Sequence, residues 1–155
     1  MTEVERLLAI EEIKALKARY FRGVDTQDAA VLRAVFADGA ETDFRSESPD
    51  GDPAFHQHDP DAFVRNTLYM LEGVTTMHLG FMPEIELLSA TEAQARWPMN
   101  DRLWVRDDAP ARLPFRTLAG WGCYHDRYRR TAAGWRILST RLERTRVDFT
   151  RDNTA

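Results

Sequence analysis

The sequence has a single cysteine and no long apolar run, and these two features exclude several classes of protein. Cys123 is the only cysteine among 155 residues, so no disulfide can form within the chain, which suits a reducing cytoplasm. No stretch of about eighteen apolar residues occurs, and the chain begins with acidic rather than basic residues. We therefore expect a soluble, unprocessed cytoplasmic protein that makes no contact with membranes.

The chain also lacks an excess of positive charge. It has 21 basic and 25 acidic residues, and its formal net charge is −4 at pH 7. A charge of this sign provides no broad positive field for a phosphate backbone, so nucleic acid is not an expected partner. The sequence shows no internal repeat, heptad pattern or low-complexity tract, and its length fits a single domain over residues 1–155.

The first half of the chain has the periodicity of helices. Apolar residues at steps of three and four in residues 4–24 predict one amphipathic helix, with Tyr20 facing the core. A short second helix should follow, capped by Asp25 or Thr26, and a third helix should begin near Asp59. This half of the chain is therefore expected to supply helices to the fold.

The second half of the chain alternates apolar and polar residues, as antiparallel strands do. A polar stretch at residues 46–61 is expected to be a loop. Helices that precede strands in this way predict an α+β fold. The expected strands cover residues 40–46, 74–82, 84–104, 114–130 and 134–149.

Alternation within residues 74–82 places His78 on the face opposite Met77, Leu79 and Phe81. If the helices cover the His78 face, the opposite apolar face stays in water in a monomer, which predicts contact between subunits. His78 itself has two interpretations: a core histidine that is hydrogen-bonded to a neighbour, or a catalytic group in a pocket.

Asp101 lies on a strand face with Trp97, Met99 and Leu103. A carboxylate in apolar surroundings is costly unless it is paired or protonated, so this position indicates either an acid/base site or a buried ion pair. Arg141 on the last strand is a candidate partner, because a guanidinium matches a carboxylate. An arginine that faces solvent is an equally good interpretation of Arg141.

Four other residues have a structural interpretation beside a functional one. Asp25 can cap a helix or orient a histidine, and Tyr20 can be a core aromatic or donate a hydrogen bond to an enolate. His56 and His58 have the alternate spacing of a metal site, but their polar loop offers no third ligand. We therefore interpret His56 and His58 as part of a solvated loop and expect no metal.

The order of these residues resembles that of SnoaL-like proteins. Residues 10–25 and 32–40 are similar to the opening of that family, residues 76–80 to its central strand, and residues 124–128 with 134–137 to its final hairpin. The resemblance implies a cone-shaped NTF2-like (cystatin-like) fold, in which N-terminal helices pack on a curved, mixed, mostly antiparallel sheet and enclose a pocket.

Within this superfamily the sequence is most similar to scytalone dehydratase and the bile acid 7α-dehydratases. By this resemblance Asp25, His78 and Tyr20 match catalytic residues, and Asp101 and Arg141 match substrate-binding residues. The resemblance implies a dehydratase, a hydro-lyase that removes water from a cyclic hydroxy-ketone-type, apolar substrate without metal or organic cofactor. It also implies a homo-oligomer, with a trimer favoured over a dimer. We expect these five residues to line one enclosed pocket.

Two other functions stay open. An isomerase that resembles ketosteroid isomerase would use a protonated Asp101 with Tyr20 to hold an enolate, and would leave His78 unused. A non-catalytic module that binds a ligand or assembles a complex has the same fold. The sequence also departs from the dehydratases at Phe44, where they have a second pocket tyrosine, and in the long loop 46–61.

Overall fold

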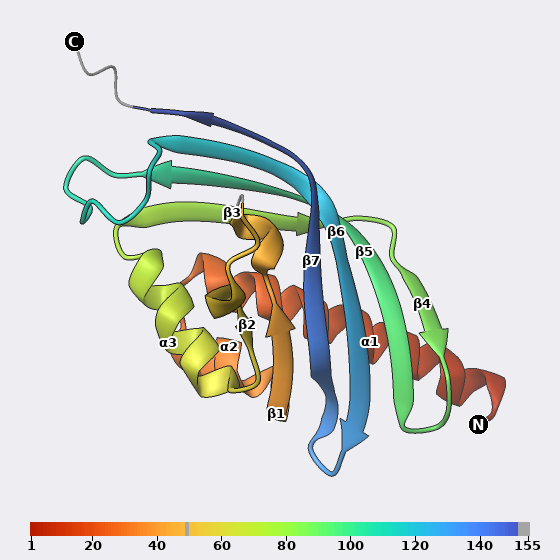
Figure 1. Ribbon diagram of the computed structural model, residues 1–155. Coiled ribbons are helices and arrows are strands. Elements are labelled where there is room, and N and C mark those ends of the chain that lie inside the picture. Colours follow the sequence, from red (N-terminus) through yellow and green to blue (C-terminus); the bar gives the residue numbers. More distant parts are fainter. Residues whose placement is uncertain (49, 152–155) are drawn as a thin grey trace.

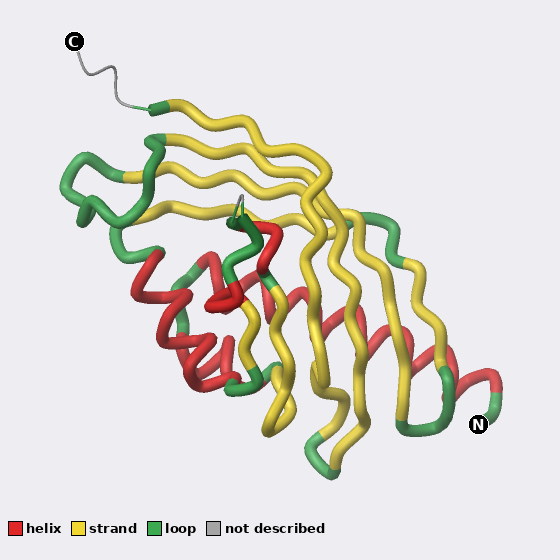
Figure 2. The backbone as a smooth tube through the Cα atoms, viewed as in Figure 1, coloured by secondary structure: helices red, strands yellow, loops and turns green. Residues whose placement is uncertain are grey.

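The computed structural model describes residues 1–48 and 50–151, which form helices packed on one seven-stranded sheet (Figures 1 and 2). The helices in this part of the chain are α1 (Glu3–Asp25), α2 (Ala29–Ala34) and α3 (Pro60–Met70), with short 3-10 helices η1 (Arg45–Glu47) and η2 (Pro53–Phe55). The strands are β1 (Phe36–Asp43), β2 (His56–Gln57), β3 (Val74–Gly80), β4 (Glu84–Leu87), β5 (Glu92–Val105), β6 (Thr117–Thr131) and β7 (Gly134–Thr150). The predicted α+β class is confirmed.

The sheet is mixed and strongly curved. Its strand order is β2-β1-β7-β6-β5-β3, and β4 pairs with β5 beside this path. Only β1 and β7 run parallel among the strands described, and the other pairs are antiparallel. In Figure 1 the long strands β5, β6 and β7 bend sharply, and the three α-helices lie on the inner side of the bend. No helix in the described residues is long and apolar enough to cross a membrane.

The first two helices begin at side-chain caps. Thr2 and Glu5 form a reciprocal capping box at the start of α1. At α2 the cap is Asp28, whose Oδ1 accepts the Val31 N–H at 3.0 Å, so the prediction that Asp25 or Thr26 caps this helix is wrong. Because Asp28 caps α2, the carboxylate of Asp25 is not used as a cap and can make other hydrogen bonds.

Two predicted strand boundaries differ in the structure. The first strand begins at Phe36 and not at residue 40, and Gly39 with φ +68° lies within an irregularity of this strand. The predicted strand 84–104 is a hairpin of β4 and β5, whose turn is held by the Ser89 hydroxyl. The predicted loop 46–61 contains η2 and the short strand β2, which pairs with β1, whereas η1 begins just before it and α3 begins within it at Pro60.

A buried ion pair joins α1 to the inner face of the sheet. Lys17 Nζ lies 2.8 Å from Asp126 Oδ2, and both side chains have 0% exposure. The Tyr128 and Thr140 hydroxyls donate to the same carboxylate, and the ammonium lies 3.7 Å from the centre of the Tyr124 ring. Burial lowers the pKa of Lys17, whereas the Asp126 charge opposes this shift. The pair fixes how α1 crosses β6 and β7, about two helical turns before Asp25 at the end of the helix.

Candidate active site

The end of α1 and the middle of β3 bring Asp25 and His78 into direct contact. His78 Nδ1 lies 2.6 Å from Asp25 Oδ1, and the His78 backbone N–H donates to Asp25 Oδ2 at 3.0 Å. The Thr76 hydroxyl donates to Asp25 Oδ1 at 2.8 Å. The side chains of His78 and Asp25 are only 11% and 24% exposed, so the pair lies mostly out of bulk water.

This hydrogen bonding decides which imidazole nitrogen is available for chemistry. A carboxylate only accepts hydrogen bonds, so His78 Nδ1 carries the hydrogen that points to Asp25. The other nitrogen, Nε2, then has the free lone pair of the neutral ring. An aspartate that holds a histidine in this tautomer and stabilises the imidazolium is the arrangement of an acid/base dyad.

Neighbouring residues fix the position of the dyad. The Gln27 side-chain amide donates to the carbonyls of Leu71 and Val74, at 2.8 and 3.0 Å, and so ties the chain just after α1 to the start of β3. The Phe21 ring stacks on the imidazole of His78, with ring centroids 6.3 Å apart and an interplanar angle of 10°. Backbone and ring contacts therefore restrain both members of the dyad.

A buried ion pair lies on the other side of the imidazole. Arg144 donates to both oxygens of Asp101, at 2.9 and 2.7 Å, and His78 Nε2 lies 3.9 Å from Asp101 Oδ2. The remaining guanidinium nitrogen, Arg144 Nε, donates to Oε1 of Glu47 in η1 at 2.7 Å. Burial lowers the pKa of Arg144, but its bonds to Asp101 and the charge of Glu47 outweigh this effect, so the pKa is raised overall.

The structure does not place Arg141 beside Asp101, and Arg144 takes the place that was predicted for it. The reason is a β-bulge in β7, where Tyr128 pairs with Ile137 and Arg127 pairs with Ser139, so that one residue of β7 is extra. Beyond the bulge the alternation is reversed. Arg141 therefore points outward, is 53% exposed and lies 3.7 Å from Glu143.

Glycine in β6 makes room for the Asp101–Arg144 pair. A Cβ atom added at Gly120 would lie 2.2 Å from Asp101 Oδ1 and 2.3 Å from Arg144 Nη1. β6 lies between β5 and β7, so the ion pair passes over a strand that has no side chain there. The two glycines Gly120 and Gly122, two positions apart in one strand, are the sequence signal that could have indicated a large group above this face.

Tyr20 lies in an aromatic cluster next to the dyad. Its ring makes edge contacts with Phe21, Phe36 and Tyr124, and its side chain is buried with 2% residue exposure. Burial raises the pKa of Tyr20, and its hydrogen bond with Tyr124 only partly opposes this. The phenol therefore keeps its hydrogen and remains a hydrogen-bond donor.

A cleft of about 600 Å³ opens at the dyad, between α1 and β3. Asp25 and His78 line it together with Lys17, Phe21 and Trp97. Tyr20 and Asp101 are buried and do not line this cleft, so the structure brings only part of the predicted set to it. Arg141 instead lines a groove of about 620 Å³ on the outer face of the sheet.

The α+β cone with an aspartate–histidine dyad at the end of its first helix defines the class of protein. The chain belongs to the SnoaL-like domain family, whose sequence profile matches residues 5–141. The fold is therefore the NTF2-like cone that the resemblance implied.

Solved structures agree with this assignment of the fold. A candidate scytalone dehydratase from Novosphingobium aromaticivorans is 17% identical, with a TM-score of 0.78 over 99% of each chain. A hexachlorocyclohexane dehydrochlorinase, LinA type 2, is 16% identical, with a TM-score of 0.77 over 97% of this chain and 95% of that chain. A protein of unknown function from Mycobacterium tuberculosis is 24% identical, with a TM-score of 0.75 over 94% and 78%.

Proposed function

We propose that the protein is a cofactor-independent dehydratase that removes water from a cyclic hydroxy ketone. The observation that carries this proposal is the Asp25–His78 dyad, in which Nδ1 is bonded at 2.6 Å and Nε2 is left for proton transfer. His78 lines the cleft, and an imidazole whose Nδ1 is held by a carboxylate while Nε2 is left without that bond is suited to general acid/base catalysis.

In this proposal one imidazole performs both proton transfers. His78 Nε2 removes a proton from the carbon next to the substrate ketone, which gives an enolate and an imidazolium that Asp25 stabilises. The imidazolium then protonates the β-hydroxyl as its C–O bond breaks, so that water leaves and a conjugated double bond forms. The histidine ends neutral, and the products are an enone and water.

The groups around the dyad suit the other demands of this reaction. Tyr20 keeps its hydrogen, as its raised pKa requires, and would donate to the enolate oxygen. The Asp101–Arg144 pair lies near Nε2, with Asp101 Oδ2 3.9 Å away, and would bind the departing hydroxyl. These roles require the substrate to reach past the cleft lining toward the sheet.

The isomerase alternative has weaker support. In that reading Asp101 carries a proton and donates it in a hydrogen bond to an enolate. Here both Asp101 oxygens accept hydrogen bonds from the Arg144 guanidinium, a two-bond arrangement that suits an accepting carboxylate and not a carboxyl group that donates. The similarity to a dehydrochlorinase favours a different second candidate, which is elimination of chloride from a ring. This reaction would also use His78 as the base, but chloride would leave without being protonated.

Turnover of a panel of cyclic β-hydroxy ketones, followed by the new absorbance of the conjugated enone, tests the proposal. Ring-chlorinated analogues and β,γ-unsaturated ketones in the same panel test chloride elimination and isomerisation. We expect enone formation with the wild type and its near-complete loss in His78→Gln, which retains hydrogen bonding but lacks a basic nitrogen. Binding of these compounds without turnover would instead support a non-catalytic module.

A further inference from the structure

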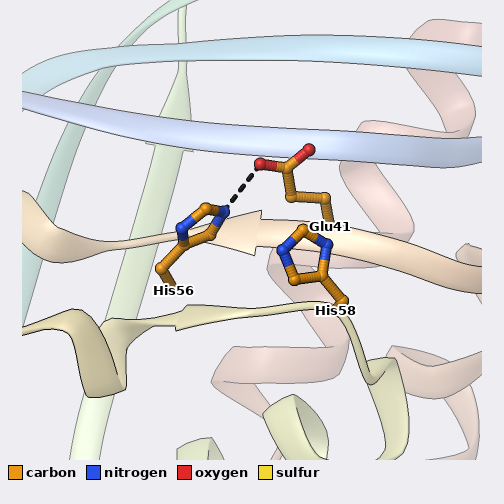
Figure 3. Close-up of side chains that lie close together, drawn as sticks. All are labelled: Glu41, His56 and His58. Atoms are coloured by element: carbon orange, nitrogen blue, oxygen red, sulfur yellow. Dashed lines mark hydrogen bonds and ion pairs between the residues drawn. The ribbon is translucent and has the colours of Figure 1, made fainter.

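Outside the dyad, the fold brings together two histidines and a glutamate from separate segments. His56 and His58 lie in and just after β2, and Glu41 lies in β1. One ligand atom from each of the three residues lies within 4.8 Å of the other two, and Figure 3 shows the side chains converging on one side of the β1–β2 pair. His56 Nε2 already lies 2.7 Å from Glu41 Oε1.

We propose that Glu41, His56 and His58 form a binding site for a divalent transition metal of the zinc type. Two imidazoles and one carboxylate are donors that zinc accepts, whereas calcium and magnesium prefer oxygen ligands alone. Three protein ligands leave a further position for water. The sequence interpretation of a solvated loop without a third ligand missed this site, because the third ligand comes from another strand.

The pairing of the two strands explains why these side chains meet. Thr42 pairs with Gln57 and Asp43 pairs with His56, so the strand direction places Glu41 next to His58. Residues two apart in an extended chain project to the same face, and the two histidines flank Gln57 in this way. The ring centroids of His56 and His58 are 4.9 Å apart.

The cluster needs only a small adjustment to close around an ion. Ligand atoms about 2.0–2.2 Å from a tetrahedral zinc are separated by about 3.3–3.6 Å. The His56–Glu41 separation of 2.7 Å is shorter than this spacing, and all three ligand atoms lie within 4.8 Å of one another. Since His58 is exposed, rotation of its ring meets no core side chain. The ion would then cross-link the edge strand β2 to β1.

Binding of Zn²⁺ to the untagged full chain, measured by calorimetry after chelator treatment, tests this inference. We expect a single ion per chain, no comparable binding of Mg²⁺, and a zinc-dependent rise in the melting temperature. His56→Ala, His58→Ala and Glu41→Gln should each weaken zinc binding by ~10-fold or more. His58→Ala is the most informative variant, because it removes an exposed ligand and leaves the core intact.

His125→Ala is the matched control, since His125 Nε2 also lies 3.0 Å from a carboxylate, that of Glu143, but His125 belongs to no such cluster among the residues that the structure describes. It should bind zinc as the wild type does. The inference is overturned if the wild type takes up no zinc, or if His125→Ala weakens binding as much as the three cluster variants do. The d–d absorption bands of bound Co²⁺ report the coordination geometry, so their change in His56→Ala and His58→Ala is a second measurement of whether these side chains are ligands.

Discussion

Asp25 accepts hydrogen bonds from the Thr76 hydroxyl, the His78 backbone and the His78 ring. Replacing it with asparagine keeps the size of the side chain, but an amide can satisfy Nδ1 in the wrong tautomer and cannot stabilise an imidazolium. We therefore expect Asp25→Asn to slow turnover by several powers of ten, about 10⁴-fold in kcat for a comparable substitution. Steady-state kinetics on a confirmed substrate measure this effect.

The double variant of Asp25→Asn and His78→Gln separates a dyad from two independent groups. If the aspartate acts through the ring, the double variant should turn over little more slowly than His78→Gln alone. Thermal melts serve as the control that each variant is folded. Additive losses in kcat would contradict the dyad.

Asp43 provides a pH-dependent contribution to stability at the residue scale. Hydrogen bonds from Arg45 lower the pKa of Asp43 from 3.8 to about 2. A carboxyl whose pKa is lowered by folding stabilises the protein above its unfolded pKa, and this stabilisation is lost as the pH falls through the folded pKa. Arg45→Gln should therefore lower the melting temperature near neutral pH, and the difference from the wild type should shrink from about pH 4 toward about pH 2.

Melting temperatures across this pH range provide the measurement. The Asp43→Asn background is the control, because Arg45→Gln should have no pH-dependent effect once the carboxyl is absent. A difference between Arg45→Gln and the wild type that stays constant down to about pH 2 would contradict the assignment.

At the scale of elements, β6 has Gly120 at the point where the ion pair between Asp101 of β5 and Arg144 of β7 crosses it. An added methyl group at Gly120 would lie within 2.3 Å of both Asp101 and Arg144. Gly120→Ala should therefore displace the guanidinium and leave a buried carboxylate poorly paired, at a cost of about 3–5 kcal/mol of unfolding free energy. Chemical denaturation measures this loss, and because Gly120 does not have a positive φ, the loss reports the clash with the ion pair and not backbone strain.

The helices and most strands could be predicted from the sequence. The bulge in β7 explains why one residue of the site could not. The periodicity of α1 and the alternation of β3 and β5 depend on local sequence, so the placements of Tyr20, His78 and Asp101 on inner faces follow from counting residues. One extra residue in β7 reverses the faces beyond it, and no local pattern marks it. Counting along β7 therefore predicts Arg141 beside Asp101, whereas the residue found there is Arg144.

Two other groups were missed because their partners lie far away in the sequence. Lys17 lies within the apolar stripe of α1, and Asp126 alternates with Tyr124 and Tyr128 on an inner strand face. Each position is unusual for a charged residue, which is a usable signal. Their pairing, over a sequence separation of 109, depends on where α1 crosses the sheet and is set by tertiary packing.

At the scale of the whole molecule, the outer face of β3 remains apolar and exposed. Met77, Leu79 and Phe81 are 52%, 43% and 45% exposed, and Trp104 on the neighbouring strand is 45% exposed. Trp104 pairs with Thr75, so it lies on the same face as Met77 and Leu79. Contiguous apolar surface of this kind is typical of a subunit interface.

We expect this face to join two or three copies of the chain, with a trimer favoured by the family resemblance. Leu79→Glu places a charge in the centre of the patch and should shift the protein toward the monomer, because an unpaired charge is costly to bury in an interface. Sedimentation velocity over a range of concentrations measures the shift. Leu88→Glu is the matched control, since Leu88 is 46% exposed but follows β4, away from this face, and its replacement should leave the assembly unchanged. A wild type that sediments as a monomer at all concentrations would contradict the prediction that this face joins copies of the chain.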